Sequence, residues 1–122
     1  MKIETKEPLC RVRDIYRLIN DFELEFYTKY SVKLNEGMLL CSLSKMKECS
    51  SGQIAELLGL TSSNSSKVII SAEKKGLIER AIGSDDKRQM FFRLTERGQE
   101  CIDCIYRESG TIVELIDKIH RI

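Results

Sequence analysis

The chain has 122 residues, of which 42% are apolar and 32% are charged, and its formal net charge is +1. This composition is that of an ordinary globular protein with a single domain over residues 1–122, and it excludes a disordered chain. No apolar run reaches the roughly 20 residues of a membrane-spanning helix, and the first ten residues, MKIETKEPLC, lack the apolar stretch of a secretory signal. We therefore expect a cytoplasmic protein that has no membrane partner.

Positive charge gathers in one part of the chain. Between Gly59 and Gly98 there are eight basic and five acidic residues, whereas the remainder has 12 basic and 14 acidic residues. A local basic patch matters more for a nucleic-acid partner than the net charge does. The segment 59–98 is therefore the first place to look for a binding surface.

The helices before this segment are predicted by spacing. Apolar residues recur every three or four positions from Leu9 to Tyr30, which predicts a helix over 9–31, long enough to pack on more than its own core. Asn35 is the expected N-cap of a second helix. The expected buried stripe of this second helix consists of Met38, Leu39, Leu40, Leu43 and Met46.

Two short helices and a hairpin follow. Ser50 and Gln53 fit a capping box for a helix that ends at Gly59, with an apolar face made of Ile54, Ala55, Leu57 and Leu58. Thr61 or Ser62 caps the next helix, which runs to about Lys75 and is closed by Gly76. Residues 77–82 and 89–94 have strand character, and the polar connection GSDDKR predicts a hairpin. Thr95 caps a further helix, Gly110 marks a break, and the chain then continues as a helix to its end.

The order helix, helix, turn, helix, hairpin predicts a mostly α fold with a small β-hairpin wing, a winged helix-turn-helix. Residues 51–98 resemble the DNA-binding core of MarR-type transcriptional regulators without a gap. The pieces that carry the resemblance are IAELLGLT, EKKGLIER, DDKR and RLTERG, in that order and spacing. The resemblance implies a DNA-binding core at about 35–94, with long dimerisation helices at 9–31 and 95–122.

The same resemblance implies a homodimer that places one recognition helix per subunit in successive major grooves of a pseudo-palindromic, double-stranded operator. Apolar residues in excess of one small core are expected to form the dimer surface. These residues are Phe22, Phe26, Ile102, Ile105, Ile112, Val113, Leu115, Ile116 and Ile119.

The residues expected to contact DNA lie on the two short helices and at the hairpin tip. They are Ser51, Ser62, Ser63, Asn64, Ser66, Lys67, Ile70, Ser71, Lys87 and Arg88. Serine hydroxyls and Lys67 can meet base edges or phosphates, while Ile70 either meets thymine methyl groups or is packed. In members of the family the arginine of the tip pairs with the aspartate, so Asp86 is expected to brace the wing while Lys87 enters a minor groove. The alternatives are plain helix capping and a solvated hairpin tip.

Five cysteines and one histidine indicate reduced thiols and no metal site. Cys101 and Cys104 lie one helical turn apart, but there is no matching second pair, and no metal or other cofactor is expected. Some MarR-type regulators sense oxidants through a cysteine near the start of the first helix, a position that Cys10 occupies beside Arg11 and Arg13. Cys10 is therefore the candidate redox sensor, and a buried or incidental thiol is the alternative.

The sequence favours a DNA-binding regulator, a repressor released by a small effector or an oxidant. The resemblance implies that an aromatic or phenolic effector binds between the dimerisation and DNA-binding regions, although no residue identifies it. The alternative is a winged-helix protein-interaction module without DNA binding, which the near-neutral charge and weakly basic recognition helix favour. An enzyme is not expected, because the chain has one histidine, no Gly-rich phosphate loop and no G-x-S-x-G motif.

Overall fold

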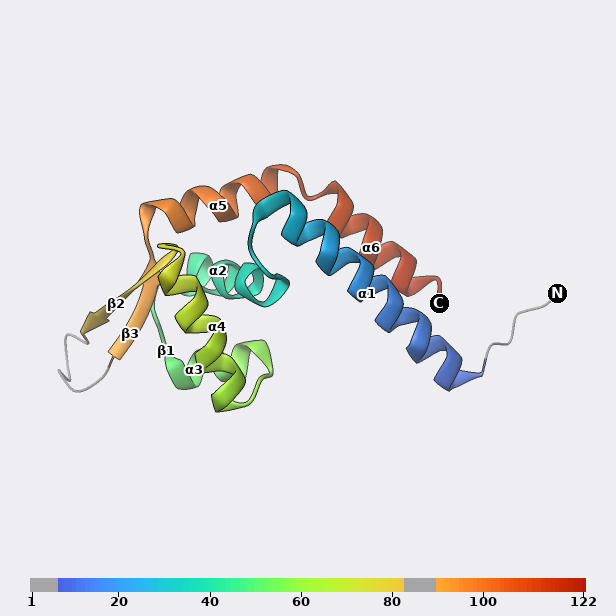
Figure 1. Cartoon of the computed structure of the whole chain (residues 1–122), viewed down its shortest axis with the longest axis horizontal. Helices are drawn as coiled ribbons and strands as arrows, with labels where there is room; N and C mark the ends of the chain where they lie inside the picture. The colour runs from blue at the N-terminus through green and yellow to red at the C-terminus, as the bar shows by residue number, and fades with distance from the viewer. Residues whose placement is uncertain (1–6, 83–89) are drawn as a thin grey trace.

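The computed structural model describes residues 7–82 and 90–122. These residues form six helices and one three-stranded antiparallel sheet. The elements in chain order are α1 (Pro8–Tyr30), α2 (Leu34–Met46), β1 (Cys49–Ser50), α3 (Ser51–Leu58), α4 (Ser62–Lys74), β2 (Ile78–Ile82), β3 (Met90–Leu94), α5 (Glu96–Arg107) and α6 (Gly110–His120). The molecule is elongated: α1 and α6 lie side by side as an arm, and α2, α3, α4 and the sheet form a compact body under α5 (Figure 1).

Most helix boundaries lie where local chemistry predicts them. The Ser50 hydroxyl accepts the N–H of Gln53, and the Gln53 side chain accepts the N–H of Ser50, which completes the expected capping box of α3. The Thr61 hydroxyl caps α4. Gly59 and Gly76 have φ of 66° and 74°, a conformation that glycine adopts without strain. The predicted ends of these two helices are confirmed.

The start of α2 is an exception. Its N-cap is Lys33, and Asn35, the expected cap, lies exposed in the first turn. The carboxylate of Glu36 accepts the N–H of Lys33 at 2.6 Å, so the helix begins two residues earlier than the asparagine suggests. Because Glu36 also contacts α4, a tertiary interaction outweighs the local capping preference of Asn35.

The sheet contains the expected hairpin and one strand that was not expected. β2 and β3 pair from Ile78 opposite Leu94 to Ile82 opposite Met90, while the connection at 83–89 lies outside the described residues. β1 pairs with the other edge of β3, which gives the strand order β1-β3-β2. A strand of two residues has no alternation that sequence analysis could detect. It joins the start of α3 to the base of the wing.

The core of the body surrounds α2. Leu39, Leu40 and Leu43 are at most 1% exposed, as expected. Met38 and Met46 were expected in the same stripe, but they are 44% and 53% exposed, so that part of the prediction is wrong. Met38 lies on the side of α2 that lines an apolar groove, and Met46 is the last residue of the helix, where no neighbouring element covers it.

α1 contributes to the core of the body as well as to the arm. Phe22 and Phe26 are buried, and the ring of Phe26 lies so close to Gly37 of α2 that an added Cβ would come within 2.8 Å of it. Ile102 and Ile105 of α5 are buried in the same core. These four side chains were expected on the dimer surface, and the prediction is wrong for them because the protomer itself covers them.

Other apolar side chains of the arm remain exposed. Those of α1 are Leu9, Val12, Tyr16, Leu24 and Tyr27, and those of α6 are Val113 and Ile116. We refer to these seven residues as the exposed arm surface. None of the helices among the described residues combines the length and the hydropathy of a membrane span.

We expect Gly98→Ala to lower the free energy of unfolding by about 3 kcal/mol or more. At Gly98, α5 approaches the body so closely that an added Cβ would collide with the carbonyl oxygen of Leu77, and backbone must move to relieve it. Gly110→Ala is the control, because a Cβ there meets nothing within 4 Å. Urea unfolding followed by circular dichroism measures both variants. Equal midpoints for the two would contradict the close approach.

Candidate nucleic-acid interface

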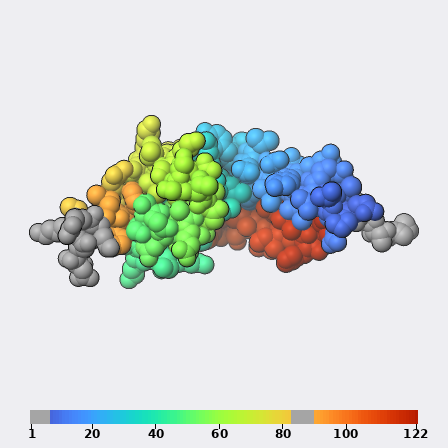
Figure 2. Space-filling view, turned by 90° about the horizontal axis from the view of Figure 1, so that it is seen from below, coloured from blue at the N-terminus to red at the C-terminus, as the bar shows by residue number. Residues whose placement is uncertain are grey.

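α3, the turn at Gly59 and Leu60, and α4 form a helix-turn-helix unit. Ile54 of α3 and Ile69 of α4 are both buried, so the two helices are held together by packing as well as by the turn. Leu57, expected on the apolar face of α3, is 51% exposed and lies on the outside of this short helix. α3 and α4, in green and yellow-green, form one continuous side of the body (Figure 2).

α4 has a buried face and an exposed face. Ser65, Ile69 and Ala72 point into the core. The exposed residues recur at spacings of three and four, and we call them the outer face of α4: Ser62, Ser63, Asn64, Ser66, Lys67, Ile70 and Lys74. Hydroxyl, amide and ammonium groups on one helix side are the groups that hydrogen-bond to base edges and phosphates.

The residues singled out in the sequence on these two helices lie on this surface, with one exception. Ser51 is exposed at the first position of α3, and the other predicted residues of α4 belong to the outer face. Ser71 does not, because it is half-buried and its hydroxyl donates to the carboxylate of Glu36. The prediction that Ser71 is exposed is wrong. Its hydroxyl holds α4 against α2.

The wing is described at its base but not at its tip. Asp86, Lys87 and Arg88 lie outside the described residues. At the base, Arg80 bonds to Glu73 at 2.8 Å, and its guanidinium lies 5.5 Å from the centre of the Phe92 ring. The ion pair thus fixes the hairpin to α4, and the contact with Phe92 joins β2 to β3 within the hairpin.

The structure also brings residues to the interface that sequence analysis did not select. Lys74 is on the outer face, two helical turns after Lys67, and that spacing was available in the sequence. Lys33, the N-cap of α2, and Asn35, in its first turn, line a groove of about 230 Å³ together with Asn64 and Lys67. Nothing in the sequence indicates that the start of α2 lies beside α4, since only tertiary packing places it there.

A buried carboxylate lies behind the outer face. Glu36 is 1% exposed and accepts three hydrogen bonds, from the N–H of Lys33, the hydroxyl of Ser71 and the ammonium of Lys75 at 2.7 Å. Burial raises the pKa of Glu36, but the bonds from Lys75, Ser71 and Lys33 outweigh it, and the pKa lies below its ordinary value. Glu36 is therefore a carboxylate held ionised in the interior.

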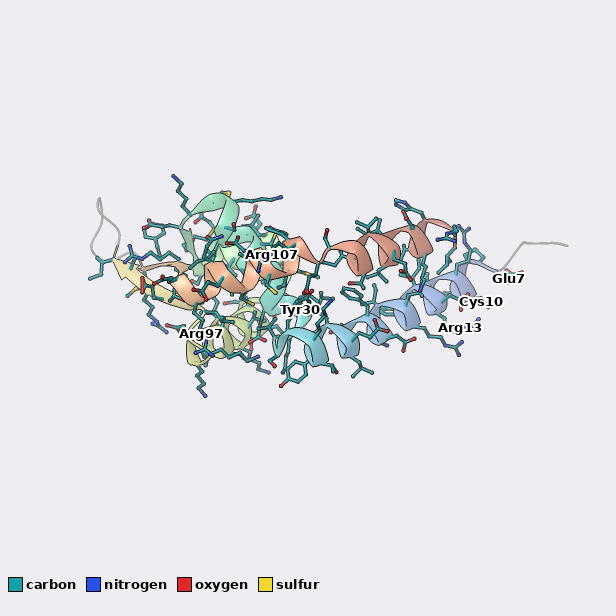
Figure 3. The ribbon with its side chains drawn as sticks, turned by 90° about the horizontal axis from the view of Figure 1, so that it is seen from above. Glu7, Cys10, Arg13, Tyr30, Arg97 and Arg107 are labelled. Atoms are coloured by element: carbon teal, nitrogen blue, oxygen red, sulfur yellow. The ribbon has the colours of Figure 1, made fainter. Side chains whose placement is uncertain are left out.

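Cys10 is distant from this interface. It is half-buried in the first turn of α1. Figure 3 shows Cys10 and Arg13 at one end of the molecule, the far end of the arm, and Arg97 at the opposite end, in the body. The guanidinium of Arg13 is paired with Asp14 at 3.2 Å, and Arg11 donates to the carbonyl oxygen of Ile122. Oxidation of Cys10 would therefore have to act on α4 through the arm.

Cys101 and Cys104 lie together on α5. Both line a groove of about 590 Å³ between the end of α1, the end of α4 and α5, and burial raises the pKa of the Cys101 thiol. Among the described residues no three His, Cys, Asp or Glu side chains are grouped as a metal ion would require. In the described part of the chain, Cys101 and Cys104 thus line a groove and do not belong to a group of metal ligands.

The fold and the interface define a winged helix-turn-helix protein with an added helical arm. The model of the MarR family matches residues 32–90, a segment that includes α2, α3, α4 and β2. The resemblance found in the sequence is thereby confirmed.

Individual proteins agree with this assignment. The uncharacterized HTH-type transcriptional regulator YwaE of Bacillus subtilis is 29% identical over 96 residues, which cover 79% of this chain and 56% of that protein. The chain therefore spans little more than half of this relative's length. The reduced form of MarR from E. coli has a TM-score of 0.77 at 14% identity, covering 98% of this chain and 86% of that one. The S. aureus MepR–DNA complex has a TM-score of 0.78 at 17% identity, covering 97% and 85%. The structural matches establish the fold.

We expect the free energy of unfolding to fall on acidification, in part through Glu36. Its folded-state pKa is below the ordinary 4.5, so its stabilising contribution is present above that value and is lost as pH falls through the folded pKa. Urea unfolding at several values between about pH 6 and pH 3 measures the slope. Glu36→Gln should be less stable at neutral pH and should lose less stability on acidification. If the acid slopes of wild type and Glu36→Gln are the same, Glu36 is not held ionised.

Proposed function

We propose that this protein is a sequence-specific, DNA-binding transcriptional regulator of the MarR type that acts as a homodimer. The observation that carries the proposal is the outer face of α4. It presents hydroxyls, an amide and two lysines in a row on a helix whose opposite face is fixed in the core. A helix of this kind fits the major groove of a duplex, where side-chain donors and acceptors distinguish base pairs.

The arm supports the dimeric part of the proposal. α1 is covered on one side by α6 and by the body, yet five apolar side chains remain exposed on its other side. A second copy of the chain would cover them. Two rigidly joined subunits can then hold their recognition helices about 34 Å apart, the distance between successive major grooves on one side of a duplex.

We assign residues 1–122 to one domain, with its DNA-binding core at about 35–94 and its dimerisation elements in α1 and the helices after Thr95. The exposed arm surface lies on α1 and α6, whereas the buried face of α5 closes the core of the body. Within the dimerisation elements, α1 and α6 would therefore provide the contact between subunits.

Repression with release by a small effector or an oxidant is the mode of action that we propose. The groove of about 590 Å³ is the candidate effector site, since Lys74 and Lys75 at the end of α4 form part of its wall, as do Tyr30 and Cys101. A molecule bound there would push on the recognition helix. Oxidation of Cys10 would instead act on the arm and thereby on the spacing of the two subunits.

The test of the proposed function is selection of bound duplexes from a random library, repeated with an oxidant present. A regulator of this type enriches a pseudo-palindrome with two half-sites. A protein-interaction module enriches no sequence and shows no salt-dependent retention on random duplex DNA. Failure to enrich any sequence at low salt would overturn the proposal in favour of the interaction module.

Substitutions on α4 and at the wing should act differently on DNA binding. Lys67→Ala should cost about 1–3 kcal/mol at one position of the selected site and change binding to scrambled DNA less. Lys87→Ala should weaken binding to both duplexes and reduce the salt slope by about one unit, because a phosphate or minor-groove contact carries little sequence information. Arg88→Ala should be worse than Lys87→Ala, since the family resemblance implies that Arg88 also pairs with Asp86.

The measurement is a titration of each variant against the selected and scrambled duplexes at several salt concentrations. Lys118→Ala, an exposed lysine of α6, is the control and should bind as wild type does. Unchanged affinity and salt slope in Lys87→Ala would mean that the wing tip does not touch DNA.

We expect sedimentation to show a dimer at micromolar concentration that Tyr16→Glu converts to monomer. Tyr16 is 65% exposed within the exposed arm surface, so the substitution leaves the protomer core intact but places a charge in the interface. Thr111→Glu is the matched control, because it adds the same charge at an exposed position of α6 that faces away from Val113 and Ile116. Wild-type protein that sediments only as monomer would contradict the dimer.

A further inference from the structure

Two segments that are distant in the sequence meet at the carboxylate of Glu36. Glu36 belongs to the first turn of α2, and Lys33, its N-cap, ends the link from α1. Ser71 lies on α4, and Lys75 is the C-cap of that helix, one turn later. Each of the three partners donates a hydrogen bond to one of the two carboxylate oxygens. The recognition helix is thereby fixed to the link that leads out of α1.

Lys75 extends this contact to α1 itself. Its ammonium donates to the carbonyl oxygen of Ser31 at 3.1 Å as well as to Glu36, and it lies 5.6 Å from the centre of the Tyr27 ring. Tyr27 is half-exposed and belongs to the exposed arm surface. The Lys75 ammonium therefore contacts three groups: the Glu36 carboxylate that holds α4, the backbone at the end of α1, and Tyr27 of the proposed dimer interface.

The backbone at Ser31 is held in an uncommon conformation at this point. Ser31 ends α1 with φ of 58° and ψ of 22°, the left-handed region that a residue with a side chain adopts at a cost. Such residues persist where their surroundings fix them. The hydrogen bond from Lys75 to its carbonyl oxygen is one such constraint, and it holds the junction of arm and body in one geometry.

We propose that Glu36, Ser71 and Lys75 form a clamp that sets the angle between the recognition helix and the dimerisation arm, and so determines which spacing of two half-sites the dimer binds. The three are positioning residues, since Glu36 is buried behind the outer face of α4 and the hydroxyl of Ser71 points inward to Glu36. The proposal rests on the proposed function, because a half-site spacing exists only for a dimer that reads DNA.

Charge provides a sharp test of this clamp. Glu36→Gln makes the protein more positive by one unit, so electrostatics alone would strengthen its binding to every duplex. Loss of the clamp has the opposite effect on the selected operator. Glu73→Gln is a matched control: it makes the same charge change on α4, but Glu73 pairs with Arg80 of β2 and not with the end of α1.

The experiment compares wild type, Glu36→Gln, Ser71→Ala and Glu73→Gln on the selected operator and on operators with one or two base pairs inserted between the half-sites. Circular dichroism and sedimentation first establish folded dimers. We expect Glu36→Gln to bind the operator about tenfold more weakly, the effect of a lost hydrogen bond to a charged group, and to discriminate less between spacings. Ser71→Ala, which keeps the charge, should show the same change to a smaller extent, and Glu73→Gln should keep the wild-type spacing preference.

Hydrogen exchange of the backbone amides at residues 68–75 tests the clamp without DNA. These amides should exchange faster in Glu36→Gln and Ser71→Ala than in Glu73→Gln, because the end of α4 is released from α2 and α1. If the wild-type protein shows no sequence-specific DNA binding, the proposed function is overturned. The exchange rates of the α4 amides would still decide whether the clamp holds α4. Spacing preference and exchange in Glu36→Gln equal to those in Glu73→Gln would overturn the clamp.

Discussion

The buried carboxylate of Glu36 is the interaction on which the arrangement of this molecule depends. Removing an ion from water costs several kcal/mol unless partners replace the lost hydration. Here the partners come from the link after α1 and from the recognition helix, at Lys33, Ser71 and Lys75. Any motion that separates these segments leaves a buried charge with too few donors. The orientation of α4 is therefore a property of the whole protomer and not of the helix-turn-helix alone.

The distribution of ion pairs explains how an almost neutral chain presents a cationic helix side. The arginines at the base of the wing are matched by carboxylates: Arg80 pairs with Glu73, and Arg93 pairs with Glu79 at 2.9 Å. Lys67 and Lys74 on the outer face have no such partner in the described part of the chain. Acidic residues thus neutralise cations that brace the fold and leave those facing outward available for phosphates.

The arm shows why α1 is long for so small a protein. One side of the helix closes the core of the body with Phe22 and Phe26, and farther along the same helix packs on α6. The opposite side carries the exposed residues from Leu9 to Tyr27. A helix that is apolar on two sides needs two partners, and the protomer supplies only one. In the proposed dimer, the junction at Ser31 and Lys75 connects the covering of this second side to the spacing of the two α4 helices.

The sequence by itself determined the local features of this protein. The capping box at Ser50, the left-handed glycines and the threonine caps depend on neighbours a few residues away, so periodicity and capping rules located the helices and the hairpin. The exposed side of α4 followed from helical spacing in the same way, and Lys74 could have been found with it. Tertiary structure alone decided the rest. Asn35 lost the cap of α2 because Glu36 is held by α4, and Ser71 turned inward for the same reason. The phenylalanines of α1 went into the core because α1 lies against Gly37, and β1 formed because β3 offered it an edge. These outcomes depend on contacts between different elements, such as Glu36 with Ser71 and Cys49 with Phe92, and no local pattern in the sequence contains them.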